Sequence, residues 1–204
     1  MGTGRGRLTR MALSRRRGDQ AGDEPSGDGG PRRGAAGAGA GDVIRVVVRP
    51  LVYDDVPAAE NLLDAAVAGR RQRRLGEEHD VLGLPGFGAW GGDELIGLAT
   101  WTAERPRAEL AVLAVAAGHR GHGIGGVLLE WVAAAGRKHG THHLWLVTTN
   151  DNLDALRLYQ RHAFRLVELH AGAIDDAREH KPEIPRDGRC GIPLRDELVL
   201  ERRL

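Results

Sequence analysis

The sequence predicts an α/β fold in which a mixed β-sheet carries helices on its faces. Three observations predict it. A continuous apolar run from Leu110 to Ala117 is long enough for a fully buried strand. A glycine-rich turn follows, and from about Gly123 apolar residues recur at helical spacing. Around this centre, short strand-like and helix-like segments alternate, and the predicted order is β-α-β-β-β-α-β-α-β-β.

The chain divides into a tail and one domain. Residues 1–42 are rich in glycine and arginine and hold almost nothing to bury, so we predict a disordered N-terminal tail. Residues 43–204 are long enough to build one core. The domain opens with a β-branched strand, Val43–Val48, which Pro50 ends. Asp54 or Asp55 can cap the helix that follows over 56–67.

The next segments lead to the buried strand. Arg70–Arg74 form a basic run, which we interpret as a solvated helix face. Phe87–Trp90 and Leu95–Thr102 predict a β-hairpin, and the buried strand begins near Ala108. After the central helix we predict a strand at 144–148 and a short helix, which Asn150 or Asp151 caps and which ends near His162. A strand at 164–169 follows. The chain then forms a loop over 171–194, with a helical turn near 174–180, and a last strand around 198–200.

Composition excludes several classes of protein. The net charge is +1, so no global field recruits nucleic acid. No apolar run approaches the ~20 residues of a membrane span, and no secretory signal is visible. The single cysteine, Cys190, excludes an internal disulfide and suits a reducing compartment, so we expect a cytoplasmic protein.

The turn between the buried strand and the central helix predicts an anion site. From Val115 to Gly126 there is no Ser, Thr, Asp, Asn or Glu that could cap the helix or repel an anion. The turn instead holds glycines, Arg120 and His122. Backbone N–H groups at a helix start have no intrahelical partner and attract negative charge, above all phosphate. The alternative is an ordinary helix start that water caps.

A dinucleotide-binding site is the nearest rival interpretation. Gly121, Gly123 and Gly126 satisfy G-x-G-x-x-G, and Asp151 follows the next strand as a ribose-binding acid would. However, the first glycine comes about six residues after the strand, where the dinucleotide turn is immediate. Too little chain follows to build the remaining parallel strands.

Two motifs resemble the GNAT acyltransferase superfamily. Arg120–Gly125, read R-G-H-G-I-G, is similar to that family's R/Q-x-x-G-x-G/A loop. Asn152–Phe164, read N-L-D-A-L-R-L-Y-Q-R-H-A-F, is similar to its second motif, apart from Ala163 where the family often has Gly. The predicted element order also matches, so the resemblance covers 43–204. It implies the GNAT fold, with central strands that splay apart.

The resemblance implies acetyl coenzyme A as cosubstrate and transfer of its acetyl group to a primary amine by direct attack. By analogy, the backbone of the glycine loop holds the pyrophosphate and two strand residues pair with the pantetheine arm. The cofactor-binding residues implied are Leu113, Val115, Arg120, Gly121, His122, Gly123, Ile124, Gly125, Gly126, Asn152 and Tyr159. A non-catalytic coenzyme A-binding module stays open as an alternative.

Two residues are candidate catalysts. Tyr159 matches the family tyrosine that protonates the departing thiolate; the alternative is a packing aromatic. Glu109 opens the buried strand and matches a general base that some members carry; the alternative is a surface acid at a strand end.

We expect no metal, because His139, His142 and His143 have no fixed ligand geometry. The acceptor is a small-molecule or peptide amine, bounded in this family by segments that correspond to 70–78 and 171–194. The alternative to a solvated helix face for the basic run is that its arginines select an acidic acceptor. We expect no nucleic-acid or membrane partner, and a monomer or homodimer.

Overall fold

A computed structural model describes residues 45–67 and 69–204 of the chain. The predicted tail and the first residues of the predicted strand Val43–Val48 lie outside the described residues. The elements are β1 (Val46–Pro50), α1 (Val56–Val67), β2 (Arg71–Arg74), β3 (Glu77–Asp80), β4 (Gly86–Gly91), β5 (Glu94–Glu104), β6 (Arg107–Val115), α2 (Ile124–Lys138), β7 (His143–Thr149), α3 (Leu153–Arg161), β8 (Arg165–His170), α4 (Ala173–His180) and β9 (Glu197–Arg203).

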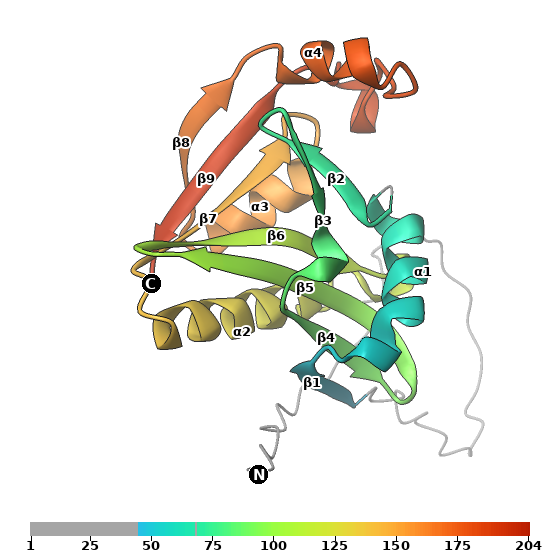
Figure 1. Cartoon of the computed structure of the whole chain (residues 1–204). Coiled ribbons are helices and arrows are strands. Elements are labelled where there is room, and N and C mark those ends of the chain that lie inside the picture. The colour runs from blue at the N-terminus through green and yellow to red at the C-terminus, as the bar shows by residue number, and fades with distance from the viewer. Residues whose placement is uncertain (1–44, 68) are drawn as a thin grey trace, which may run out of the picture.

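The main sheet is mixed, as predicted. Its strand order is β1-β4-β5-β6-β7-β9-β8, and β2 with β3 forms a separate hairpin. Within the described residues, β6 and β7 form the one parallel pair of the main sheet, and its other neighbours are antiparallel. This topology, with α2 as the connection between the parallel strands, matches the fold class predicted from the sequence (Figure 1).

Helices cover both faces of the sheet. Successive strand residues point to opposite faces, so Leu98 and Ala99 of β5 enter different cores. Leu98 packs with Leu62 and Leu63 of α1, whereas Ala99 belongs to the larger core that α2 and α3 cover. The helix that begins at Ile124 therefore buries the apolar stripe that its sequence period predicts.

The two parallel strands separate soon after they meet. They share three register pairs, Arg107↔His143 to Glu109↔Trp145, although β6 continues to Val115 and β7 to Thr149. Figure 1 shows β7 climbing away from β6 beyond this point. On its other edge, β6 has an irregularity at Ala111, which has no partner between the pairs Trp101↔Leu110 and Thr100↔Val112. The central strands thus splay at Glu109.

The basic run at 70–74 was wrongly predicted as a helix face. Arg71–Arg74 pair with Glu77–Asp80 as the β2–β3 hairpin, through a turn at Leu75 (φ 49°) and Gly76 (φ 81°). Opposite charges face each other across the hairpin, and Arg71 donates to Glu78 at 2.8 Å. The hairpin crosses in front of β5 and β6 (Figure 1), and the Leu75 N–H at its tip donates to the buried Glu197 carboxylate of β9 at 2.8 Å.

Two predicted helix caps were also wrong. Asp55 lies in a 3-10 turn before α1, where its carboxylate accepts the Val52 N–H at 2.9 Å and pairs with Arg49. Helix α3 begins after Asn152 without a side-chain cap. The Asp151 carboxylate instead accepts the Arg189 N–H at 2.9 Å, which ties the long segment before β9 to the start of α3.

Candidate functional site

The start of α2 has the backbone that an anion site requires. Gly121 (φ 76°) and Gly123 (φ 83°) occupy the left-handed region, where a side chain is strained. Gly123 is the N-cap residue of α2, and no side chain caps the helix. Among the described residues, no backbone N–H from Gly121 to Gly126 has an acceptor outside the helix. The predicted bare helix end is therefore present.

The electrostatics of this end are also as predicted. The loop contributes no acidic side chain, and the exposed Arg120 lies beside it. Arg120 is oriented by its Nε, which donates to the Val115 carbonyl at 3.0 Å. This bond occupies the carbonyl of one strand residue that was predicted to pair with the cofactor. The Nδ1 of His122 is buried and has no hydrogen-bond partner among the described residues.

Close packing explains why two other positions of the loop are glycine. A Cβ at Gly126 would lie 2.7 Å from Nε2 of His162, and a Cβ at Gly125 would lie 3.2 Å from Leu158. These glycines let α3 approach the first turn of α2. The Ile124 side chain is fully buried, so only the backbone of Ile124 can contact a ligand.

Tyr159 lies on α3 within the larger core. It is 8% exposed, and its ring lies 5.6 Å from the Phe164 ring, centroid to centroid. Burial raises the pKa of its phenol above the usual range, so the group holds its proton at neutral pH. Its neighbours Leu158 and His162 make the contacts with the start of α2 described above. Tyr159 is therefore a protonated phenol on a helix that adjoins the glycine loop.

Asn152 is engaged by the protein itself. Its amide nitrogen donates to Thr148 Oγ1 at 3.2 Å, and its amide oxygen accepts from Arg189 Nη1 at 2.6 Å. This predicted cofactor residue joins β7, α3 and the segment before β9.

Glu109 is not a surface acid. Its side chain is 9% exposed and lies where β6 and β7 begin to splay. One carboxylate oxygen, Oε1, accepts a short hydrogen bond from Nε of Arg74, whose side chain is equally buried. The second oxygen, Oε2, has no hydrogen bond to a described residue. Sequence reasoning included Arg74 in the 70–78 segment that bounds the acceptor, but it did not pair Arg74 with Glu109, because the two residues lie 35 positions apart in the chain. The available signal was a basic run that ends directly before Leu75-Gly76.

Two cavities open on the face of the sheet that α1 and the hairpin cover. One, of about 300 Å³, is lined by Arg74 and Glu77 of the hairpin and by Glu104, Arg107, Glu109 and Trp145 of the sheet. We call it the hairpin cavity.

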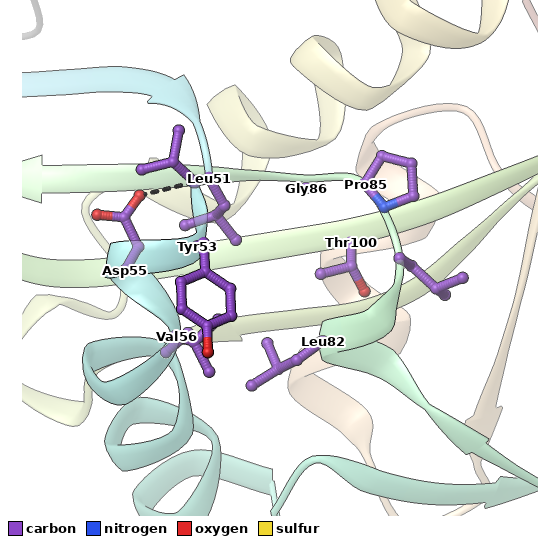
Figure 2. A pocket seen from close by; sticks show the side chains of 11 residues that line it. Leu51, Tyr53, Asp55, Val56, Leu82, Pro85, Gly86 and Thr100 are labelled. Carbon is purple, nitrogen blue, oxygen red and sulfur yellow. Dashed lines mark hydrogen bonds between the residues drawn. The ribbon is translucent and has the colours of Figure 1, made fainter.

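The other cavity, of about 280 Å³, lies at the start of α1. Figure 2 shows its mainly apolar walls, with Tyr53 and Val56 on one side and Leu82 and Pro85 on the other. None of the predicted site residues lines it.

Neither a metal nor a membrane site emerges from the described part of the chain. Residues 45–67 and 69–204 hold no group of three side chains that could ligate a metal. No helix in the same residues is long and apolar enough to span a membrane.

Fold, splayed strands and glycine loop together define a family. The model of the Acetyltransferase (GNAT) family matches residues 56–164, which include α1, both parallel strands, the loop and α3. The chain belongs to this family. The family match confirms the resemblance stated from the two motifs and favours it over the dinucleotide interpretation.

One relative by sequence is named as an acetyltransferase, and another is uncharacterised. The streptothricin acetyltransferase of Streptomyces lavendulae is 40% identical over 96 residues, which are 46% of this chain and 50% of that protein. The uncharacterised protein YxbD of Bacillus subtilis is 38% identical over 122 residues, 59% of this chain and 76% of its own length.

Solved structures share the fold. An IAA acetyltransferase from Bacillus cereus is 25% identical with a TM-score of 0.63, covering 78% of this chain and 99% of its own. A nourseothricin acetyltransferase is 25% identical with a TM-score of 0.57, and the match covers 78% of this chain and 98% of that chain. A Bacillus subtilis acetyltransferase in complex with CoA, 22% identical, has a TM-score of 0.60 and covers 78% and 97%.

Proposed function

We propose that this chain transfers the acetyl group of acetyl coenzyme A to a primary amine of a small molecule. The observation that carries the proposal is the uncapped start of α2, with left-handed glycines and Arg120, placed at the end of a strand that splays from its neighbour. A peptide amine is the second acceptor class, and the assay below includes it.

The residues of the loop fit a pyrophosphate. N–H groups without acceptors and the nearby guanidinium are donors, and no carboxylate opposes an anion there. We assign the pyrophosphate to the backbone of Gly121, Gly123 and Gly125 with Arg120. We assign the pantetheine arm to the backbone of Leu113 on the splayed strand and to the backbone N–H of Val115. Acetyl coenzyme A supplies the thioester whose C–S bond is replaced by a C–N bond to the amine, with free thiol as the second product.

Two side chains are proposed to move protons. Tyr159 holds its proton at neutral pH and can give it to the departing sulfur, after which solvent restores it. Glu109 can take the proton that the amine loses, through Oε2, while Arg74 fixes the other oxygen. The hairpin cavity places this carboxylate at the point where the strands splay.

An assay of thiol release tests the proposal. Acetyl coenzyme A is offered with streptothricin, the substrate class in the name of one relative, and with lysine, polyamine and peptide amines. We expect a small-molecule amine to cause release of free thiol from acetyl coenzyme A. Tight coenzyme A binding without release for any amine would instead indicate a non-catalytic binding module.

The base and the location are tested separately. Glu109→Gln should lower transfer at neutral pH and recover partly at high pH, where free amine is abundant (a lysine-like amine has a pKa of ~10.4). Equal rates for both proteins across that range would remove Glu109 from the mechanism. We also propose a cytoplasmic location, supported by the single-cysteine composition, and cell fractionation tests it.

A further inference from the structure

Strand β8 presents apolar side chains at an open edge of the main sheet. It ends the strand order, and within the described residues it pairs with β9 alone (Figure 1). Leu166, Val167 and Leu169 are 57%, 55% and 57% exposed, and they are three of the seven large apolar side chains that the described residues expose. No backbone group of Arg165–His170 bonds to a described residue outside the β8–β9 ladder. Such an edge is a template for another strand.

A bulge in β8 gathers its leucines on one face of the sheet. Leu166 and Leu169 lie opposite Leu200 and Leu198 of β9, and the register shifts between them, at Val167. Leu200 is buried in the larger core, and Leu198 packs against that core. Residues that lie opposite one another in a sheet point to the same face. Both leucines of β8 therefore extend the apolar face of the larger core to the exposed edge.

The other face of the strand is charged. Glu168 and His170 lie opposite Val199 and Glu197 of β9, and Nε2 of His170 is 3.2 Å from Oε1 of Glu168. Strand β8 is therefore amphipathic, with leucines on one face and a glutamate–histidine pair on the other. A contiguous exposed apolar strip of this kind is typical of an interaction site.

We propose that β8 pairs with β8 of a second copy of this chain, antiparallel and centred on Leu169. In a pairing with twofold symmetry, residues equally far from the centre lie opposite each other. Leu169 then faces Leu169, and Glu168 faces His170 twice, so that matching faces and opposite charges meet. A pairing centred on Glu168 would place two carboxylates opposite each other. One centred on Val167 would set Leu166 against Glu168, which belong to different faces.

This interface stands apart from the proposed function, because none of the residues assigned to acetyl transfer lies on β8. Sedimentation of the full-length protein tests it. The wild-type protein should change from monomer to dimer across micromolar to millimolar concentrations. Leu169→Lys removes an apolar contact from each copy and places two ammonium groups opposite each other, so it should raise the Kd of the dimer by about 100-fold or more.

A matched variant locates the interface. Val52 is similarly exposed, at 55%, but it follows β1, which forms the opposite edge of the sheet. Val52→Lys adds the same charge at an exposed apolar position and should keep the wild-type Kd.

A cysteine cross-link tests the register. The background is Cys190→Ser, which removes the exposed native thiol. In it, Leu169→Cys should form a disulfide-linked dimer under mild oxidation, because the Cβ atoms of directly opposite residues lie about 4.5–5.5 Å apart, close to the span of a disulfide. Leu166→Cys should give no such dimer, because its two thiols would lie about 20 Å apart along the strands. The uncharged cysteine also decides the question if the lysine variant fails to fold.

Three outcomes overturn the proposal. The first is a wild-type protein that stays monomeric at every concentration, as it would if residues 1–44 covered the strand. The second is a dimer whose Kd is unchanged in a folded Leu169→Lys protein. The third is a disulfide-linked dimer through Leu166→Cys and not through Leu169→Cys. Each of these results leaves acetyl transfer standing, since thiol release is measured independently on the same preparations.

Discussion

Breaking the Arg74–Glu109 pair should destabilise the protein far more than breaking a surface pair. Both side chains are 9% exposed, so removal of one partner leaves an uncompensated charge out of water. Such a change typically costs about 3–5 kcal/mol, whereas an exposed pair contributes about 0–1 kcal/mol. We therefore expect Arg74→Met and Glu109→Leu each to lower the free energy of unfolding by about 3–5 kcal/mol.

The double variant is the informative one. With both charges replaced by apolar groups, no buried charge is left unpaired, and such replacements are often neutral or even stabilising. Arg74→Met/Glu109→Leu should therefore be much more stable than the sum of the single effects predicts.

Urea unfolding measures the whole cycle. With a slope of about 2 kcal/mol per molar urea, each single change lowers the midpoint by roughly 2 M. The matched control is Arg71→Met, which breaks an ion pair on the same hairpin whose arginine is 68% exposed; Glu78 keeps its other partner, Lys181, so the midpoint should move little. Losses under 1 kcal/mol for the Arg74 and Glu109 single variants, or additive effects in the double variant, would refute the burial argument.

Three further predictions concern α2 and α3. Gly126→Ala should lower the free energy of unfolding by about 1–3 kcal/mol, because its Cβ would lie 2.7 Å from Nε2 of His162. In thermal unfolding, a second change, His162→Ala, should recover part of this loss. An unchanged melting temperature for Gly126→Ala would contradict the close helix contact. Tyr159→Phe should lower kcat by roughly 10- to 100-fold with coenzyme A affinity nearly unchanged, and wild-type kcat in a chemistry-limited regime would show a packing aromatic. In a Tyr53→Phe protein, Tyr159 is the single tyrosine. Burial raises the pKa of its phenol, so phenolate absorbance should be absent at pH ~10, where a free tyrosine is half ionised. The raised pKa means that the folded state holds the proton more tightly, so its contribution to stability is complete below pH ~10 and is lost as pH rises further. A phenolate signal with a midpoint near 10 in the folded protein would contradict the burial.

Local sequence patterns were enough to predict the centre of the fold. The apolar run of β6, the glycine turn and the apolar period of α2 each come from neighbouring residues, and each is present in the structure. The absence of capping residues before Ile124 likewise predicted the bare helix end. The prediction for α4 also held, because Ile174 and Ala177 lie at helical spacing and are both buried.

The hairpin could not be predicted in this way. Its strands carry charged side chains instead of an apolar alternation, and its pairing depends on opposite charges that face each other across the turn. The tip is held by Glu197, which is 122 residues away in the chain. The same distance problem concealed Arg74 as the partner of Glu109, 35 residues apart. The capping errors at Asp55 and Asp151 have a related cause, since both carboxylates bind groups outside the helices that they precede.

Coenzyme A binding to a variant of the glycine loop tests the central claim most directly. Gly123→Asp places a carboxylate at the N-cap position of α2, where the anion is proposed to bind, and Gly92→Asp makes the same change at an exposed left-handed glycine in the β4–β5 turn. Calorimetric titration should show tight coenzyme A binding and weak NAD binding for the wild-type and Gly92→Asp proteins. It should show no coenzyme A binding for a folded Gly123→Asp protein, because the added charge repels the phosphates. Retained coenzyme A affinity in that variant, or tighter binding of NAD than of coenzyme A, would contradict the account.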